Sequence, residues 1–437
     1  MTLVVQGTGA TVPVARGCAS IGRMDKIKIH SEIGRLRAVI VHEPGAEIEN
    51  MAPGMAASSL YDDLLFLPPA QYEHRQLRRV LEQVATVYHL TDLMQVVLQD
   101  AVARRQLVAQ LCELHACPEL SGRLVGLPPE VLARQLICGT PMKKDTLSKF
   151  LSPRAFSLPP LPNAFFMRDA AMCIHDKVVI SAMASHVRAS EAAILRALFH
   201  HHPDLRARGV YFDGTRGTAG SDFSLEGGDV LVLRSDLMLV GLSGRTRMGA
   251  IDQLLHSLVD SGRLRDMIVV ELPETRATIH LDMTFTMLDE QRCLVYPPLM
   301  TGPRRAPAIH IRIEDGRVAR IEQRAGLLDA LSELGVDLKP VSAGGDDPLV
   351  QEREQWSSGA NVFTMAPGVV IGYERNRATF EALGREGYRV MTADAFVAEG
   401  VDIDRHGPLA IMMEGEELNR GGGGCRCMTL PVYRDDL

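Results

Sequence analysis

The chain has 437 residues, of which 23% are charged, and its formal net charge at pH 7 is −7. This acidic balance, without a basic run interleaved with aromatic residues, argues against a nucleic-acid-binding protein. No apolar run is long enough to span a bilayer, and a hydrophobic share of 46% is ordinary for a soluble globular chain with a sizeable core.

The cysteines and the first residues bear on the compartment. The chain has 8 cysteines, without the regular spacing of a disulfide framework and without a Cys-x-x-Cys pair that would suggest zinc. We therefore expect a reducing cytoplasm. Residues 1–25 lack the charged and then apolar stretches of a signal peptide, so we expect a disordered leader before a folded domain over residues 26–437. The sequence leaves open whether the protein forms a homo-oligomer.

The first folded elements have strand and helix patterns in turn. A short apolar run over Ala38–His42 ends at a Glu-Pro-Gly turn and predicts a strand. Apolar residues at helical intervals predict a helix over Gln71–Val84, and Ala85–Leu90 has a strand pattern. Between residues 91 and 150 the helical spacing recurs with prolines in between, which predicts an insertion of several short helices.

The rest of the chain repeats one pattern. A small polar residue opens an apolar strand, a short turn follows, and a second apolar strand completes a predicted hairpin. Helical segments such as Ala189–Phe199 and Ala250–Leu258 separate the hairpins. The residues that open them are Asp169, Asp229, Asp282 and Asn361.

The repeated hairpin and helix predict an internally pseudo-symmetric α/β domain, although the irregular spacing excludes a strict solenoid. In such a domain the four opening residues would face one axis. Carboxylates gathered there would repel one another unless a cation shared the site, so the implied ligand is a guanidinium, an amine or a metal.

Two of the openings have further polar neighbours. Glu226 precedes Asp229 in a Glu-Gly-Gly-Asp motif, and His280 precedes Asp282 by two residues. Residues two apart on a strand point to the same face, so the imidazole and the carboxylate of this His-x-Asp would lie together. A lone His-x-Asp is more often structural, but beside a nucleophile such groups supply a base and anchors.

The nucleophile candidate follows a glycine-rich loop near the end of the chain. An apolar run over Leu409–Met413 predicts a buried strand, and four glycines then precede Cys427. Glycines let the backbone approach a ligand closely, and the neighbouring cation Arg426 would favour the thiolate, the reactive form of cysteine. The alternative is a small buried cysteine next to a flexible tail.

Several motifs are specific as a set, although each is weak alone. They are Asn163-Ala-Phe-Phe-Met-Arg-Asp169, Glu226-Gly-Gly-Asp229, Gly-Arg245-Thr, Thr-Ile-His280-Leu-Asp282-Met-Thr-Phe, Glu-Gln-Trp356, Asn361-Val and the glycine loop with Cys427-Met. With this set the chain resembles arginine deiminase, of the superfamily of enzymes that modify guanidino groups. The resemblance covers residues 27–435 and includes the helical insertion, which that family also has.

The resemblance implies an α/β fold, a five-bladed propeller of ββαβ units, and hydrolysis of L-arginine to L-citrulline and ammonia without a metal or an organic cofactor. It implies that Cys427 attacks the guanidinium carbon to form an S-alkylthiouronium intermediate. Asp169 and Asp282 would hold the guanidinium nitrogens, and His280 with Glu226 would move protons.

The resemblance also assigns the other end of the substrate. Arg188 and Arg245 match arginines that bind the α-carboxylate, with Asn163 nearby. Phe166 matches the residue that packs on the aliphatic stem, and Gly421 matches a substrate-binding position of the glycine loop.

The loop departs from the family at two positions. The family commonly has a second arginine where this chain has Gly422, and Cys425 stands where proline or glycine is usual. A glycine at position 422 removes a charge and adds backbone freedom. We therefore expect a wider mouth, a raised KM for L-arginine and tolerance of substrates modified around the α-carbon.

Four alternatives remain open at the level of sequence. An amidinotransferase would use the same core with a second amine as acceptor, and Gly422 favours a hydrolase for another guanidino compound. A metal-dependent hydrolase would use His280, Asp282 and Asp229 as ligands. A relative without activity would bind guanidino ligands only.

Overall fold

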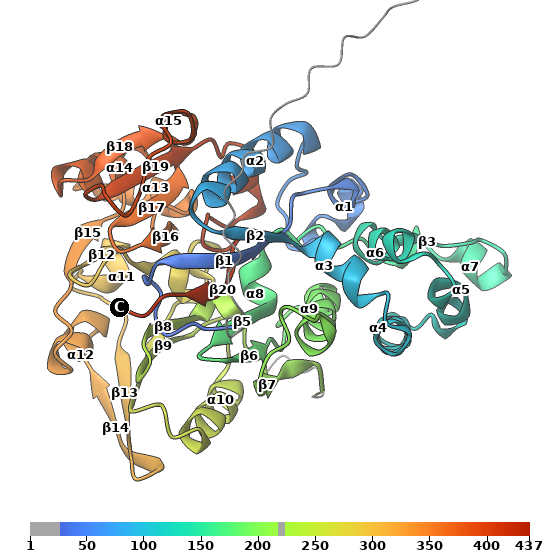
Figure 1. Ribbon diagram of the computed structural model, residues 1–437, viewed down its shortest axis with the longest axis horizontal. Helices are drawn as coiled ribbons and strands as arrows, with labels where there is room; N and C mark the ends of the chain where they lie inside the picture. Colours follow the sequence, from blue (N-terminus) through green and yellow to red (C-terminus); the bar gives the residue numbers. More distant parts are fainter. Residues whose placement is uncertain (1–26, 217–222) are drawn as a thin grey trace, which may run out of the picture.

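The computed structural model describes residues 27–216 and 223–437. The expected leader over residues 1–25 lies outside the described residues. In the described ranges, no helix combines the length and the apolar character needed to cross a membrane. Figure 1 shows the described chain as an assembly of small α/β sheets with helices around them.

The described part contains five sheets of one plan, in which an antiparallel strand pair is followed by a helix and by a third, parallel strand. In one of them, β5 (Ala171–Ile174) pairs antiparallel with β6 (Lys177–Ile180), and α9 (Ala189–His201) leads to β7 (Val210–Asp213), which is parallel to β6. The expected α/β class and the four expected hairpins are confirmed.

Three further sheets follow this plan later in the chain. Their strands are β8 (Val230–Arg234), β9 (Leu237–Leu242) and β10 (Asp266–Glu271), then β11 (Phe285–Met287), β12 (Arg292–Val295) and β15 (Lys339–Ser342), then β16 (Phe363–Ala366), β17 (Val369–Tyr373) and β19 (Leu409–Met413). Their connecting helices are α10 (Met248–Asp260), α12 (Leu327–Glu333) and α14 (Arg377–Arg385). Most of these strand residues are buried, which explains the near-continuous apolar runs in the sequence.

The remaining sheet joins the two ends of the described chain. Strand β1 (Leu36–Val41) is parallel to β2 (Thr86–His89), which it reaches through α2 (Leu67–Val84). On its other side β1 pairs antiparallel with β20 (Leu430–Arg434), the last strand of the chain. Figure 1 shows β20, in red, beside β1, in blue.

Three additions extend this plan. Strand β18 (Arg389–Thr392) pairs parallel with β19 at the edge of its sheet. Hairpin β13 (Ala308–Glu314) and β14 (Arg317–Arg324) continues the sheet of β10. A group of helices follows β2 and lies to one side of the sheets, on the right in Figure 1. These helices are α3 (Leu90–Val97), α4 (Ala101–Leu114), α5 (Ser121–Val125), α6 (Pro129–Cys138) and α7 (Leu147–Leu151).

The four opening residues do not lie in strands but in the segments just before them. Asp169 is in the one-turn helix α8 (Met167–Ala170), Asp229 in η6 (Gly227–Asp229) and Asp282 in η8 (Leu281–Met283). The same-face argument for the His-x-Asp motif is therefore wrong, because β11 begins only at Phe285. Short turns let each side chain leave the strand direction, and Asp282 then lies near Cys427 while Asp229 turns to Ser243.

Candidate active site

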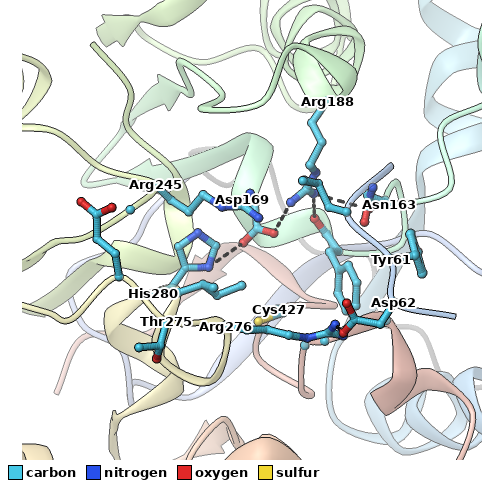
Figure 2. A pocket seen from close by; sticks show the side chains of 18 of the residues that line it. Tyr61, Asp62, Asn163, Asp169, Arg188, Arg245, Thr275, Arg276, His280 and Cys427 are labelled. Carbon is cyan, nitrogen blue, oxygen red and sulfur yellow. Dashed lines mark hydrogen bonds and ion pairs between the residues drawn. The ribbon is translucent and has the colours of Figure 1, made fainter. Parts of the chain in front are cut away.

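A cavity of about 480 Å³ opens where the turns of several sheets meet the glycine loop. This volume suits a small molecule. Figure 2 shows the side chains that line it. Those expected from the sequence are Asn163, Phe166, Asp169, Arg188, Arg245, His280, Gly421 and Cys427. Glu226 and Asp282 are buried behind this lining rather than part of it.

The glycine loop is shaped by close packing. A Cβ atom at Gly423 would lie 2.6 Å from the ring of Phe166, and one at Gly424 would lie 2.6 Å from the carbonyl oxygen of Asn361. Among the four successive glycines only Gly422 has a positive φ, at +88°. The glycines thus bring the backbone before Cys427 against the cavity wall, which a flexible tail would not do.

Cys427 is buried beside a carboxylate. Its Sγ lies 3.8 Å from Oδ2 of Asp282, and its backbone N–H donates to Oδ1 of Asn361 at 3.2 Å. Burial raises the pKa of the Cys427 thiol well above its ordinary value, and the carboxylates of Asp282 and Asp169 raise it further. The protein alone therefore holds a thiol there.

The expected effect of Arg426 on the thiol is present but small. The Arg426 guanidinium donates to Oδ2 of Asp282 at 2.7 Å and to Glu32 at 3.1 Å. Its charge lowers the pKa of Cys427 but does not overcome the effects of burial and of the two carboxylates. The cation next to Cys427 in sequence therefore also fixes Asp282.

His280 is held between two carboxylates. Its Nε2 lies 2.9 Å from Oε2 of Glu226, and its Nδ1 lies 3.7 Å from Oδ1 of Asp169. Burial lowers the pKa of His280, but the charge of Asp169 and the hydrogen bond with Glu226 outweigh it and raise the pKa to about 9. The ring is an imidazolium at neutral pH.

Glu226 is a permanent anion behind the imidazolium. Burial acts to raise its pKa, but the charge of Arg245 and the hydrogen bond of His280 prevail and lower it to about 2. The N–H of Ala184 donates to Oε1 at 3.0 Å, and Nη1 of Arg245 lies 3.4 Å from Oε2. These partners fix the carboxylate and, through it, the ring of His280.

The Glu-Gly-Gly-Asp motif has a packing reason. A Cβ atom at Gly228 would lie 2.4 Å from Nδ1 of His280, so only glycine admits the ring at this distance. Asp229 points away from the cavity, accepting from the N–H of Leu281 at 2.9 Å and from Oγ of Ser243 at 2.7 Å. Burial raises the pKa of Asp229 to about 6. Asp229 thus supports the turn that carries His280.

The most informative feature is a set of buried polar atoms without partners. Among the described side chains, Oδ1 of Asp169, Oδ1 of Asp282 and Nδ1 of His280 have no hydrogen-bond partner. A buried polar atom left unpaired costs about 1–3 kcal/mol. The two carboxylate oxygens can only accept, so beside the thiol they mark the place of a ligand with several N–H donors, whereas Nδ1 of the His280 imidazolium is itself a donor.

Arg188 lines the cavity and is paired with carboxylates. Its guanidinium, 4% exposed, lies 2.5 Å from Oδ2 of Asp169 and donates to Glu191 at 2.8 Å and to the carbonyl of Phe166 at 3.2 Å. Figure 2 shows Asp169 between Arg188 and His280. In this arrangement Arg188 positions Asp169, and its binding of an α-carboxylate stays a prediction. Arg245 is 19% exposed at the cavity wall.

One group of side chains has the proximity that a metal ion needs. The ligand atoms of Asp169, Glu226 and His280 lie within 4.8 Å of one another. The set differs from the one expected for a metal-dependent hydrolase, because Asp229 faces Ser243. A metal ligand must be a neutral imidazole, and the raised pKa of His280 opposes that state.

Sequence reasoning missed three charged residues of the cavity, Asp62, Glu274 and Arg276. The side chains of Asp62 and Arg276 form an ion pair across its mouth, which joins segments more than two hundred residues apart. The available signals were the Asp62-Asp63 doublet and an arginine four residues before His280. Neither forms a motif, so only the fold reveals the pair.

Comparison with known proteins gives one consistent result. The model of the arginine deiminase family matches residues 134–434. The arginine deiminase of Oenococcus oeni is 30% identical over 430 residues, covering 94% of this chain and 98% of its own. That of Listeria monocytogenes is 32% identical over 428 residues with the same coverage.

Solved structures show the same α/β fold at low sequence identity. An amidinotransferase of the saxitoxin biosynthetic pathway from Microseira wollei has a TM-score of 0.50 at 15% identity, covering 94% of this chain and 98% of its own. The N-terminal domain of ArgZ, an arginine dihydrolase of cyanobacteria, has a TM-score of 0.50 at 13% identity, covering 91% and 97%.

Proposed function

The chain belongs to the arginine deiminase family, an enzyme family that hydrolyses L-arginine to L-citrulline and ammonia through a covalent cysteine intermediate, and we propose that Cys427 is the nucleophile. The observation that supports this assignment is the set of unpaired buried atoms of Asp169, Asp282 and His280 around the thiol. A planar guanidinium has N–H donors for both carboxylates, and its positive charge offsets theirs.

Substrate binding prepares the nucleophile. A guanidinium between Asp169 and Asp282 neutralises the two carboxylates that help to raise the pKa of Cys427. The thiol then loses its proton to solvent, and the thiolate faces the guanidinium carbon. Holding both groups in this geometry replaces an encounter between separate molecules.

The chemical steps use one acid and base. The thiolate forms a C–S bond, and the His280 imidazolium gives its proton to the departing nitrogen, which leaves as ammonia. The neutral ring then takes a proton from water, which attacks the S-alkylthiouronium carbon. The C–S bond breaks, and the remaining hydroxyl proton passes to the sulfur, which restores the thiol and releases the neutral ureido product. His280 is again protonated, with Glu226 holding the ring throughout.

A single end-point assay tests this function. The purified protein is incubated with L-arginine, agmatine and other guanidines, in chelator and without an acceptor amine, and ammonia and ureido product are measured. We expect equal amounts of citrulline and ammonia from L-arginine. No product without an added amine would indicate an amidinotransferase, and loss of activity in chelator would indicate a metal hydrolase.

We also propose that the five sheets are the blades of a five-bladed propeller that forms one catalytic domain. Their common plan of two antiparallel strands, a helix and a parallel strand supports this arrangement. Helices α3 to α7 are then an insertion between blades. A cytoplasmic location is part of the proposal, because all seven described cysteines are free, as in a reducing compartment.

A further inference from the structure

A line of charged groups leads from the back of the site to the sulfur. Oε2 of Glu32 accepts from Nε of Arg426 at 3.1 Å, and Nη1 of Arg426 donates to Oδ2 of Asp282 at 2.7 Å. The same carboxylate oxygen lies 3.8 Å from Sγ of Cys427. Glu32 comes from the segment before β1, so a single guanidinium connects this distant segment to the carboxylate beside the nucleophile.

Glu32 is a buried anion among several cations. Its side chain is 12% exposed, and the N–H of Val232 donates to Oε1 at 3.4 Å. Burial acts to raise its pKa, but the charges of Arg426 and Arg168 outweigh burial and lower the pKa to about 2. Arg434 is a third buried guanidinium that acts in the same direction. Glu32 is therefore ionised at neutral pH and is the counter-ion of these arginines.

Three acceptors from different segments fix the orientation of Arg426. Nε donates to Glu32, Nη1 to Asp282 and Nη2 to the carbonyl oxygen of Val230 at 3.1 Å. Only Oδ2 of Asp282 is occupied in this way, and Oδ1 has no hydrogen-bond partner among the described residues. A guanidinium next to a carboxylate commonly binds both of its oxygens in a fork. The acceptor at Nε opposes that arrangement here.

We propose that Glu32 is a positioning residue, which holds Arg426 to one oxygen of Asp282 and so leaves the other oxygen to the substrate guanidinium. This inference rests on the proposed function, which places that guanidinium beside Cys427. Without Glu32, Nε of Arg426 loses its acceptor, and the guanidinium is free to turn until both oxygens of Asp282 accept from it. Asp282 would then have no oxygen left for the substrate.

The test removes the two ends of the Glu32–Arg426 pair singly and together. Wild type, Glu32→Leu, Glu32→Gln, Arg426→Met and the double variant Glu32→Leu with Arg426→Met are assayed on L-arginine and agmatine. Asp266→Leu and Asp266→Asn are matched controls, because Asp266 is also a buried carboxylate that pairs with an arginine, Arg312, on β10 and away from the cavity. Tm is measured for every variant.

A lost charge-assisted hydrogen bond predicts the size of the effect. We expect Glu32→Leu to lower kcat/KM by roughly 10- to 100-fold on both substrates. Glu32→Gln keeps an acceptor of about half the strength and should lower it by about 3- to 10-fold. In the Arg426→Met background, Glu32→Leu should add less than about threefold, because both residues act through one contact. The Asp266 variants should lower Tm and leave kcat/KM within about twofold.

Alkylation of Cys427 by iodoacetamide, followed against pH, gives a readout that loss of stability alone would not produce. The charged groups around the sulfur are Asp282, Asp169, Arg426 and, on the same cavity wall, His280. A forked pairing with Arg426 neutralises Asp282 more fully, so the profile of Glu32→Leu should move to lower pH. Arg426→Met removes a cation and should move the profile to higher pH.

Three results would overturn the inference: unchanged kinetics in Glu32→Leu, losses of the two single variants that multiply in the double variant, or alkylation profiles that move in the same direction. If Glu32→Leu does not fold, Glu32→Gln decides, and a profile that fails to move to lower pH contradicts the inference. If wild type releases no citrulline, the proposed function fails, while the alkylation profiles still test the pair. If citrulline forms and the losses multiply, only this inference fails.

Discussion

The floor and the mouth of the cavity are built differently. On the floor, Asp169, Glu226, His280, Asp282 and Cys427 are buried, and each is fixed by neighbours from other turns. At the mouth, Asp62 and Arg276 are partly exposed and pair mainly with each other. The floor therefore keeps reacting groups in place at a large desolvation cost, whereas the mouth keeps charges that exchange partners at small cost.

This difference separates chemistry from selection. A change on the floor should reduce the reaction on every guanidine, and a change at the mouth should alter only the preference among them. Substitutions that break this rule would show that the two regions act as one.

The largest effect is expected at the sulfur. Cys427→Ser should lower kcat at least about 10³-fold on all substrates, because a serine hydroxyl is a poor nucleophile without a strong base. Thermal unfolding and circular dichroism check that the fold is kept. In wild type, quenched reactions analysed by mass spectrometry should show an adduct on Cys427. A serine variant with normal turnover would remove the thiol from the mechanism.

The carboxylates and the imidazole come next. Asp169→Asn and Asp282→Asn keep the shape but lose charge-assisted hydrogen bonds, so kcat/KM should fall by on the order of 10² on every substrate, about 3 kcal/mol. His280→Ala should be nearly inactive. Steady-state kinetics on L-arginine and agmatine measure this, and a loss confined to L-arginine would contradict the division between floor and mouth.

The pH dependence of stability tests two residues of the floor, His280 and Glu226. The pKa of His280 is about 9 in the folded protein and about 6.5 in an unfolded chain. Its proton therefore stabilises the fold fully below about pH 6.5, and this contribution is lost as the pH rises through about 9. Glu226, with a pKa near 2, stabilises the fold above about pH 4.5 and loses this effect as the pH falls toward 2.

The catalytic rate should depend on whether His280 is protonated. We expect kcat to decline above about pH 9, and Glu226→Gln to move this decline to lower pH because Glu226 helps to raise the pKa of His280. Rate profiles and Tm between pH 5 and 10 measure both effects. An alkaline decline that stays in place in a folded Glu226→Gln protein would disconnect the two residues.

The smallest effect is expected just outside the mouth. Asp63→Asn removes an exposed ion pair with Arg420, and such pairs contribute about 0–1 kcal/mol. Tm should change little, and kcat/KM should stay within about twofold for each guanidine substrate. A selective loss on L-arginine would show that this exposed pair takes part in the choice of substrate.

The sequence predicted the floor better than the mouth for a physical reason. Buried apolar runs and the close-packed glycines leave strong local patterns, and the four hairpins were expected from them. The turn at His280 and Asp282 was taken for a strand because short helical turns have no period of their own. The direction of Arg426 depends on Glu32, which is distant in sequence.

The mouth depends on contacts that no local pattern records. Asp62 and Arg276 meet only after distant turns have been brought together, and exposed ion pairs tolerate many sequences. The different surroundings of Arg188 and Arg276 were also beyond the sequence, since both are arginines that pair with an aspartate. What separates them is burial and the number of occupied donors.

The pairing of β20 with β1 has a consequence for the assembly of the site. Cys427 lies just before β20, and β20 is held by β1, hundreds of residues away in the sequence. Closing so long a loop costs conformational entropy, which the rest of the folded chain must offset. Fraying of this one strand pair would therefore displace the nucleophile, while the carboxylates and the imidazole, which are carried by other sheets, would stay in place.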